Sequence, residues 1–251
     1  MEQQQLKTIV LDFPDAARVL EKFGLDFCCG GNDTLVQACA KKNVQWPIVL
    51  EALQGVMKTG QERKEYSQQV ERLRNLSAGA LAKDIIDTHH RFLREHIPYL
   101  KELLDKVTRV HGGRHAELQK LQPLVHKTVD TLLVHLDDEE KGLFKMVQEH
   151  AADQPLTDQE FRTAQEWIAS LEQEHVEVGE QLQQIRDLTQ DYQAPADGCG
   201  SYRLLYAKLK QLEEDTHLHV HKENYVLFPG VAKLVAATAA ASPKMSATAA
   251  V

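Results

Sequence analysis

The sequence predicts an all-α protein: an antiparallel up-down four-helix bundle that follows a small helical domain. Composition is the first reason, because 43% of the 251 residues are hydrophobic, only 6% are aromatic, and β-branched runs are short. The second reason is a stripe of apolar residues at alternating spacings of three and four, which recurs in four long stretches after Ser77. This spacing marks the buried face of a helix. The loops between the stretches are short, which favours antiparallel neighbours.

Residues 1–58 are expected to form the small domain, with three short helices. Each helix has a residue that favours its beginning or its end. The expected helices are one from Phe13-Pro14 to Gly24, capped by Asp12; one through Cys39 and Lys42, capped by Asp33 or Thr34; and one from Pro47 to about Met57. Residues 59–76 are polar and lack a clear stripe, so they are expected to be a linker.

Residues 77–235 are expected to form the bundle. The four helices run from Ser77 to about His111, from about His115 to His150, from Thr157 or Asp158 to about Ile185, and from Tyr202 to Phe228. Pro98 and Pro123 lie inside the first two helices and are expected to kink them, because proline removes a backbone hydrogen bond. The Ala-rich residues 236–251 are expected to be a disordered tail.

Charge and composition exclude several classes of function. The net charge of −8 argues against a nucleic-acid or anionic-membrane partner. No apolar run approaches the ~20 residues of a membrane span, and the first residues lack the basic and apolar regions of a secretory signal. Four cysteines, two of them adjacent, do not resemble a disulfide framework. A cytoplasmic location is therefore predicted.

Histidine and glutamate interrupt the apolar stripes of the bundle. Each long helix places one histidine on its stripe, and two helices add a glutamate four residues later: His90, His135, Glu139, His175, His219 and Glu223. Burying a carboxylate without a partner costs far more free energy than burying a leucine gains. Four imidazoles and two carboxylates in one core therefore predict a dinuclear metal site, with the carboxylates free to bridge the ions.

The ligand types narrow the choice of metal. Nitrogen and oxygen ligands without a thiolate favour non-haem iron or manganese over a structural zinc ion. A single histidine on an apolar face is more often a core residue bonded to a backbone carbonyl, so the prediction depends on the six residues being in phase. His89 is the rival of His90 if the first long helix is rotated about its axis.

Other polar residues near the six have less support as parts of the site. His217 and His221 flank His219 but lie about 200° away on a helical wheel, so they are expected to face solvent or the surroundings of the ligands. Three acidic residues could accept hydrogen bonds from the imidazoles, although solvated charges are the preferred interpretation: Glu174, Asp138 and Glu140. Four further histidines are expected at the surface or at helix ends: His111, His115, His126 and His150.

Cys28 and Cys29 form a second signal, separate from the bundle. Adjacent cysteines rarely pair with each other because the small ring is strained, and the two glycines that follow keep the turn accessible. The thiols are interpreted either as redox-exchange, metal-contacting or cluster-contacting groups, or as small hydrophobic residues in a turn. Cys39 is expected in a helix core, and Cys199 in an exposed Gly-rich loop.

Several segments together resemble the iron–sulfur cluster repair di-iron proteins, the RIC family of YtfE-, ScdA- and DnrN-like proteins. In the small domain, the matching residues are Leu25-Asp26-Phe27-Cys28-Cys29-Gly30-Gly31, then Thr34-Leu35 and Ala38. In the bundle, the matching segments contain His90, His135 with Glu139, Glu174-His175, and His219 with Glu223 leading to Leu227-Phe228-Pro229. The resemblance extends to about residue 235. It departs from the family at Lys145, where the family tends to have proline.

The resemblance implies a haemerythrin-like domain in which the same six residues hold two non-haem iron ions, bridged by the glutamates and by an oxo group when oxidised. It implies repair of iron–sulfur clusters damaged by nitrosative or oxidative stress, with the damaged iron–sulfur proteins as partners and NO or O₂ as small ligands. Iron donation, reduction of NO to N₂O, or both would do this, with Cys28 and Cys29 as redox or docking thiols. The alternative is a haemerythrin-like protein that binds or senses O₂ or NO without turnover.

Overall fold

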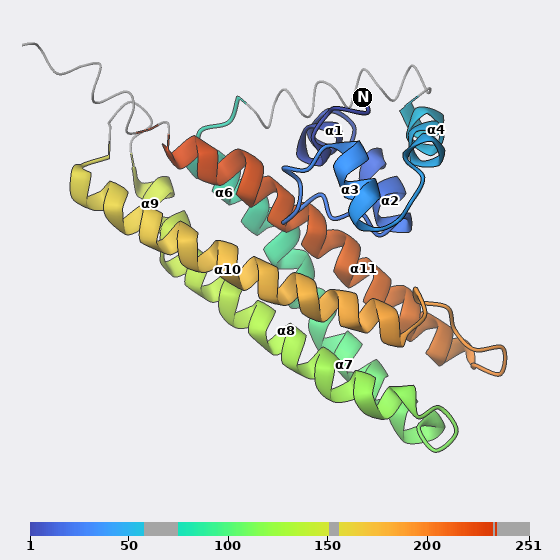
Figure 1. The fold of residues 1–251 in the computed structure, drawn as a ribbon. Helices are drawn as coiled ribbons and strands as arrows, with labels where there is room; N and C mark the ends of the chain where they lie inside the picture. The colour runs from blue at the N-terminus through green and yellow to red at the C-terminus, as the bar shows by residue number, and fades with distance from the viewer. Residues whose placement is uncertain (58–74, 151–155, 233, 235–251) are drawn as a thin grey trace, which may run out of the picture.

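A computed structural model describes residues 1–57, 75–150, 156–232 and 234. Within these ranges the chain is helical, with no β-strand, and the predicted fold class is confirmed (Figure 1). Residues 59–74 of the predicted linker, the predicted turn around 153–155 and the predicted tail at 236–251 lie outside the described residues. In the part of the chain that is described, no helix has the length and apolar composition needed to cross a membrane.

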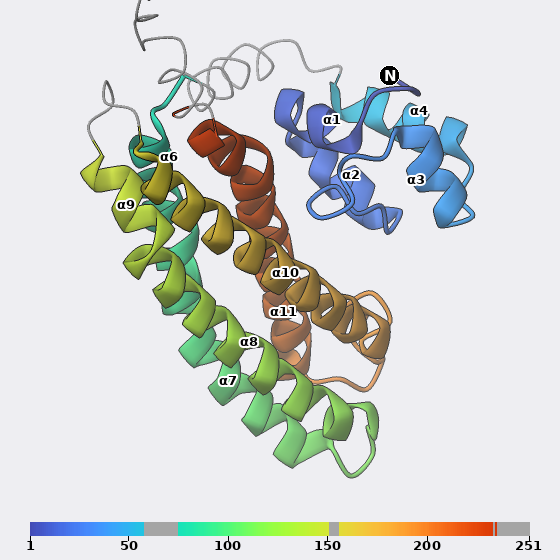
Figure 2. The same cartoon turned by 60° about the vertical axis from the view of Figure 1, so that its left-hand side comes forward.

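Four long helical stretches form the bundle. Its elements are α6 (Ala78–Ile85), η1 (Ile86–His90), α7 (Arg91–His111), α8 (Glu117–Lys141), α9 (Leu143–Glu149), α10 (Asp158–Leu188), α11 (Gly200–Lys222) and η2 (Glu223–Leu227). Helices α7 and α10 each contact both α8 and α11, so the four make a closed ring around one core (Figures 1 and 2). That core is apolar over most of its length, and Leu100, Leu104, Leu121 and Leu205 are fully buried in it.

The small domain consists of α1 (Leu6–Asp12), α2 (Asp15–Lys22), α3 (Leu35–Lys41) and α4 (Trp46–Met57). It lies beside α11 in both views of the molecule (Figures 1 and 2). Its own core includes Leu6, Leu20, Leu35 and Leu53, and Val220 of α11 packs into the same cluster. The small domain and the bundle are therefore joined by an apolar contact as well as by the chain.

Several predicted helix ends agree with the observed capping. Ser77 accepts a hydrogen bond from the amide of Ala80. Of the two candidates at each of two other helices, Thr34 rather than Asp33 and Thr157 rather than Asp158 form capping boxes. A capping box satisfies two backbone donors that the first turn of a helix leaves without partners.

Two predictions about the helices are wrong. Asp12 was expected to cap the first helix, but it is the last residue of α1, a helix that the sequence analysis missed. Only seven residues long, α1 has too few turns to show a clear stripe, although Leu6, Ile9 and Val10 are buried. The expected helix from His115 to His150 is divided at Gly142, whose φ of −99° and ψ of −106° are not helical.

Two π-helical turns, η1 and η2, interrupt the first and last long stretches at the level of His90 and Glu223. A π-helical turn contains more residues than an α-helical turn, and such turns occur often at functional sites. The added residue changes which side chains face inward, so His89 and His90 are both buried. Two neighbouring histidines of η1 thus lie in the interior, at the level of the other inward histidines.

Candidate metal centre

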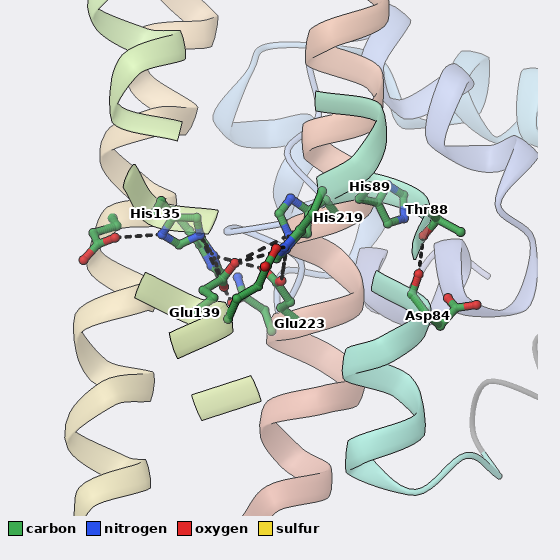
Figure 3. A network of polar contacts seen from close by, with 12 residues as sticks. Asp84, Thr88, His89, His135, Glu139, His219 and Glu223 are labelled. Carbon is green, nitrogen blue, oxygen red and sulfur yellow. Dashed lines mark hydrogen bonds and ion pairs between the residues drawn. The ribbon is translucent and has the colours of Figure 1, made fainter. Parts of the chain in front are cut away.

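The structure brings the six predicted residues together between the four bundle helices. All are at most 2% exposed: His90, His135, Glu139, His175, His219 and Glu223. Figure 3 shows four of them, from α8, α11 and η2, pointing toward one another. They form two groups that could each hold a metal ion, and both glutamates belong to both groups.

Each half of the centre has a pair of facing imidazoles. The Nε2 atoms of His90 and His219 are 3.1 Å apart, and those of His135 and His175 are also 3.1 Å apart. A hydrogen bond between two such nitrogens needs a proton on one of them, whereas a metal ion accepts the lone pairs of both. The pairs therefore fit two cations, one in each half.

The glutamates lie between the two histidine pairs. Glu139 places Oε2 3.3 Å from Nε2 of His90 and Oε1 3.3 Å from Nε2 of His135. Glu223 places Oε1 2.7 Å from Nε2 of His219 and Oε2 3.2 Å from Nε2 of His175. Each carboxylate thus offers one oxygen to each half, which is the arrangement that a bridging ligand needs.

None of these four carboxylate oxygens accepts a hydrogen bond, although both glutamates are fully buried. Buried carboxylates are normally paired, hydrogen-bonded or bound to metal, because an isolated charge in the interior is very costly. Cations at the two groups would compensate both carboxylates at once. The donor set, four imidazole nitrogens with two carboxylates, suits borderline to hard transition-metal ions.

The histidines and glutamates of the centre also shift one another's pKa values. Burial disfavours a charged imidazole at His135, but the neighbouring Glu139 outweighs this effect and raises its pKa to about 10. Burial likewise disfavours a charged carboxylate at Glu223, but His219 and His175 hold its pKa well below the usual range. Protons bound to these nitrogen and oxygen atoms take the lone pairs that a cation would use, so metal and protons compete for the centre.

In three of the four histidines, Nδ1 points away from the metal position and bonds a side chain of a neighbouring helix. Nδ1 of His90 lies 2.7 Å from Glu140, and Nδ1 of His135 lies 2.7 Å from Glu174. The preferred interpretation of these two glutamates as solvated charges is therefore wrong. A proton held on Nδ1 leaves Nε2 unprotonated and directed at the metal position.

Nδ1 of His175 lies 2.9 Å from Oδ1 of Asn224, a residue that the sequence analysis did not select. The only signal for Asn224 is its place directly after Glu223. Two aromatic rings were missed as well: Phe144 stacks on His90 at 5.4 Å, and Phe228 stacks on His175 at 6.0 Å between ring centroids. These rings cover the centre from the side of α9 and from the residues after η2.

His89 does not join either ligand group, although it is buried. Its ring stacks on His219 with centroids 5.6 Å apart, and its Nδ1 lies 2.9 Å from Asp215. Figure 3 shows it on the far side of His219 from His135. Of the two rivals in this helix, the structure places His90 among the six residues.

His217 and His221 face the small domain, where His221 is buried and His217 is half-buried. Nδ1 of His217 lies 3.1 Å from Glu21, and Nε2 of His221 lies 3.1 Å from the carbonyl of Lys7. The ring of Phe27 makes edge contacts with both histidines. Residues of α11 four apart therefore form the surface on which the small domain packs.

The structure places Cys28 and Cys29 in a turn that packs against η2. Cys28 is 4% exposed, and the hydrogen bond to Cys29 together with burial raises its pKa well above the usual value. Asn224 donates to the carbonyl of Cys28, and Tyr225 to that of Cys29, both at 3.3 Å. The thiol turn and His175 thus share one partner, Asn224.

The remaining cysteines agree with their predicted surroundings. Cys39 is buried and Cys199 is exposed. His111 is the last residue of α7, which agrees with the predicted helix end, and it is buried there with Nε2 3.2 Å from the sulfur of Cys199.

Comparisons with known proteins cover both parts of the chain. Residues 81–231 match the family described as hemerythrin HHE cation binding domain, and residues 2–57 match a domain of unknown function, DUF542. The iron-sulfur cluster repair protein ScdA of Staphylococcus haemolyticus is 33% identical over 224 residues, which cover 88% of this chain and 94% of that protein. The iron-sulfur cluster repair protein YtfE of Yersinia pseudotuberculosis is 33% identical over 226 residues, which cover 90% and 95%.

A probable iron-sulfur cluster repair protein of Haemophilus influenzae is 29% identical over 229 residues, which cover 91% of this chain and 96% of that protein. The matches span the small domain and the bundle together, so the similarity extends to the way in which the two are combined. The chain therefore belongs to the family of ScdA and YtfE, in which a hemerythrin cation-binding domain follows the small N-terminal domain.

Proposed function

We propose that the six residues hold two non-haem iron ions and that the protein repairs iron–sulfur clusters damaged by nitrosative or oxidative stress. The observation that carries the iron proposal is the sharing of Glu139 and Glu223, each of which directs its two oxygens at different histidine pairs. The names of the relatives support repair over carriage of O₂ or NO. The damaged iron–sulfur proteins would then be the partners.

The protein contributes orientation and exclusion of water. Glu140, Glu174 and Asn224 hold protons on the Nδ1 atoms of three ligands, so that each Nε2 keeps its lone pair for the metal. Phe144 and Phe228 cover two of the imidazoles, which strengthens the electrostatic interactions inside the centre.

Two ferrous ions, when bound there, would supply coordination positions for NO or O₂ and two electrons, enough to convert two NO molecules and two protons into N₂O and water. The six protein ligands leave positions free at both ions, because four histidines and two shared carboxylates do not fill two coordination shells. Loss of iron to a damaged cluster is the second route to repair that the same site supports.

Cys28 and Cys29 are proposed to serve as redox or docking thiols for this activity. Their turn contacts the residue that bonds His175, so it lies next to the centre without contributing a ligand. A variant with Cys28→Ala and Cys29→Ala is expected to keep the two irons of the bundle while losing cluster repair or NO consumption. Unchanged activity would reduce the two thiols to a structural role.

Metal analysis combined with Mössbauer spectroscopy tests the iron proposal. We expect about two irons per chain, and we expect His135→Ala to lose most of them because the centre loses one ligand of a shared pair. His126→Ala is the matched control, since His126 lies on the same helix and bonds Asp105 away from the centre. Zinc alone in the wild type, or wild-type iron in His135→Ala, would overturn the assignment.

Repair itself is measured by restoring a nitric-oxide-damaged iron–sulfur enzyme with the purified protein. We expect recovery with the wild type and none with His135→Ala. Equal recovery with both proteins would show that repair does not need the metal centre, and would overturn this part of the proposal.

A further inference from the structure

A cavity of about 500 Å³ lies between the small domain and the bundle. One wall is the turn that carries Asp26, Cys28 and Cys29, and the opposite wall includes Gly179 of α10 and Glu213 of α11. None of the six residues of the bundle centre lines this cavity. The two thiols therefore face a space of their own, large enough for a small ligand.

The donor atoms of this turn are spaced as the ligands of one metal ion are. The sulfurs of Cys28 and Cys29 are 3.8 Å apart, and Oδ1 of Asp26 is 3.3 Å from the sulfur of Cys28. Two sulfurs bound to one tetrahedral ion at about 2.3 Å are about 3.8 Å apart, and a sulfur and a carboxylate oxygen on the same ion are about 3.5 Å apart. Both observed distances agree with a single ion.

The turn is held in this shape without a metal. Oδ1 of Asp26 accepts the amide hydrogens of Cys28 and Cys29 at 3.0 and 2.9 Å, and Oδ2 accepts that of Gly30 at 2.9 Å. From the other side, η2 holds the turn through the carbonyls of both cysteines, which accept hydrogen bonds from Asn224 and Tyr225. The donors therefore need no large rearrangement to bind an ion.

We propose that Asp26, Cys28 and Cys29 form a separate site for one thiophilic divalent cation, with a coordination position that opens into the cavity. Two thiolates make the site softer than the bundle centre, which has no sulfur ligand, so it favours Zn²⁺, Co²⁺ or Fe²⁺ over harder ions. Binding releases the two thiol protons and leaves the carboxylate as the third ligand. Three protein ligands with an open position are typical of sites that exchange a ligand, whereas closed four-ligand sites are structural.

The site lies next to the bundle centre. Asn224 bonds His175 through Oδ1 and the carbonyl of Cys28 through Nδ2, so one side chain connects the two. This inference does not depend on which metal the bundle holds, because the donors of the two sites do not overlap.

Titration of the reduced, full-length protein with Co²⁺ tests this site. A thiolate bound to Co²⁺ gives a charge-transfer absorption that imidazole and carboxylate ligands do not give, so the band reports a thiolate site and not metal in the bundle centre. We expect the band to saturate at one Co²⁺ per chain. The variant with Cys28→Ser and Cys29→Ser is expected to lose it, whereas Cys39→Ser with Cys199→Ser, the matched control for the other two cysteines, is expected to keep it.

His135→Ala tests whether the band comes from this site or from the bundle centre. It removes a bundle ligand and is expected to leave the band unchanged. Far-ultraviolet circular dichroism checks that each variant is folded. Should the serine substitutions unfold the small domain, Asp26→Asn is the second variant. Its single oxygen still accepts the amides of Cys28 and Cys29, while the charge and the acceptor for Gly30 are lost, and it is expected to weaken Co²⁺ binding. Absence of the band in the wild type, or its persistence in the folded Cys28→Ser, Cys29→Ser variant, would overturn the proposal.

Discussion

The two halves of the bundle are built on the same helices but bury different side chains. One half, which we call the apolar half, contains the α7–α8 turn and the beginning of α11. Its stripes carry leucine and valine, such as Leu104, Leu121 and Leu205. In the half that contains η1 and η2, which we call the polar half, the same stripes also carry histidine and glutamate, next to a second apolar cluster that includes Ile85 and Phe144. Each buried apolar group stabilises the fold by itself, at about 25 cal/mol per Å², whereas the buried glutamates require a compensating cation.

The difference also appears in the backbone. The apolar half tolerates regular helices, because burial depends on area and shape and not on the direction of individual atoms. The polar half has two π-helical turns, three interhelical bonds to Nδ1 atoms and a helix break at Gly142. Ligands must point in particular directions, so the polar half needs more local irregularity than the apolar half.

Removal of the metal is expected to lower the free energy of unfolding more than any substitution below, because it leaves the polar half without its cations. At a metal concentration a thousand times its dissociation constant, bound metal adds about 4 kcal/mol to the free energy of unfolding. Chelator-treated protein should therefore unfold at a lower urea concentration than metal-loaded protein. Coincident urea transitions for the two samples would mean that the polar half is stable without a cation.

The substitution Leu104→Ala is expected to lower the free energy of unfolding by about 3 kcal/mol, because it leaves a cavity in the apolar half. Metal content should stay at the wild-type value, since Leu104 lies outside both ligand groups. Val110→Ala is the matched control on the same helix, where the side chain is 61% exposed. Loss of metal from Leu104→Ala would show that the two halves are coupled.

Replacement of Glu174 by glutamine is expected to weaken metal binding by about 10- to 100-fold without preventing it. The glutamine loses the charge that pairs with Nδ1 of His135, so the imidazole becomes a poorer and less oriented ligand. Competition with a chelator measures the change, and Glu177→Gln, at an exposed position on the same helix, is the control. Equal affinities in both variants would contradict a role for Glu174.

The smallest effect is expected from Tyr202→Phe, about 1 kcal/mol in the free energy of unfolding. This substitution removes two polar contacts of the apolar half, a hydrogen bond of 2.9 Å from the Tyr202 hydroxyl to Glu117 and one of 3.3 Å between the hydroxyls of Tyr202 and Tyr206. Tyr99→Phe, at a half-exposed ring, controls for the loss of a hydroxyl. A destabilisation as large as that of Leu104→Ala would show that this half also depends on a polar network.

Periodicity explains why so much of the molecule could be predicted. The spacing of three and four is a local property of each helix, so the four long stretches and the six inward residues could be found without knowing how the helices pack. Short helices and breaks gave weaker signals, and α1 and the division at Gly142 were missed for that reason. The assignment of His90 over His89 depended on helix rotation, which η1 changes by one residue.

By itself the sequence determined the all-α class, the order of the long helices and the residues that line the polar half. Only the tertiary structure decided which oxygen of Glu139 faces which histidine pair, and that Glu140, Glu174 and Asn224 bond the imidazoles. It also decided that His217 and His221 contact the small domain. The physical reason is that a stripe fixes only the inward face of one helix, whereas contacts between helices depend on their relative rotation and offset.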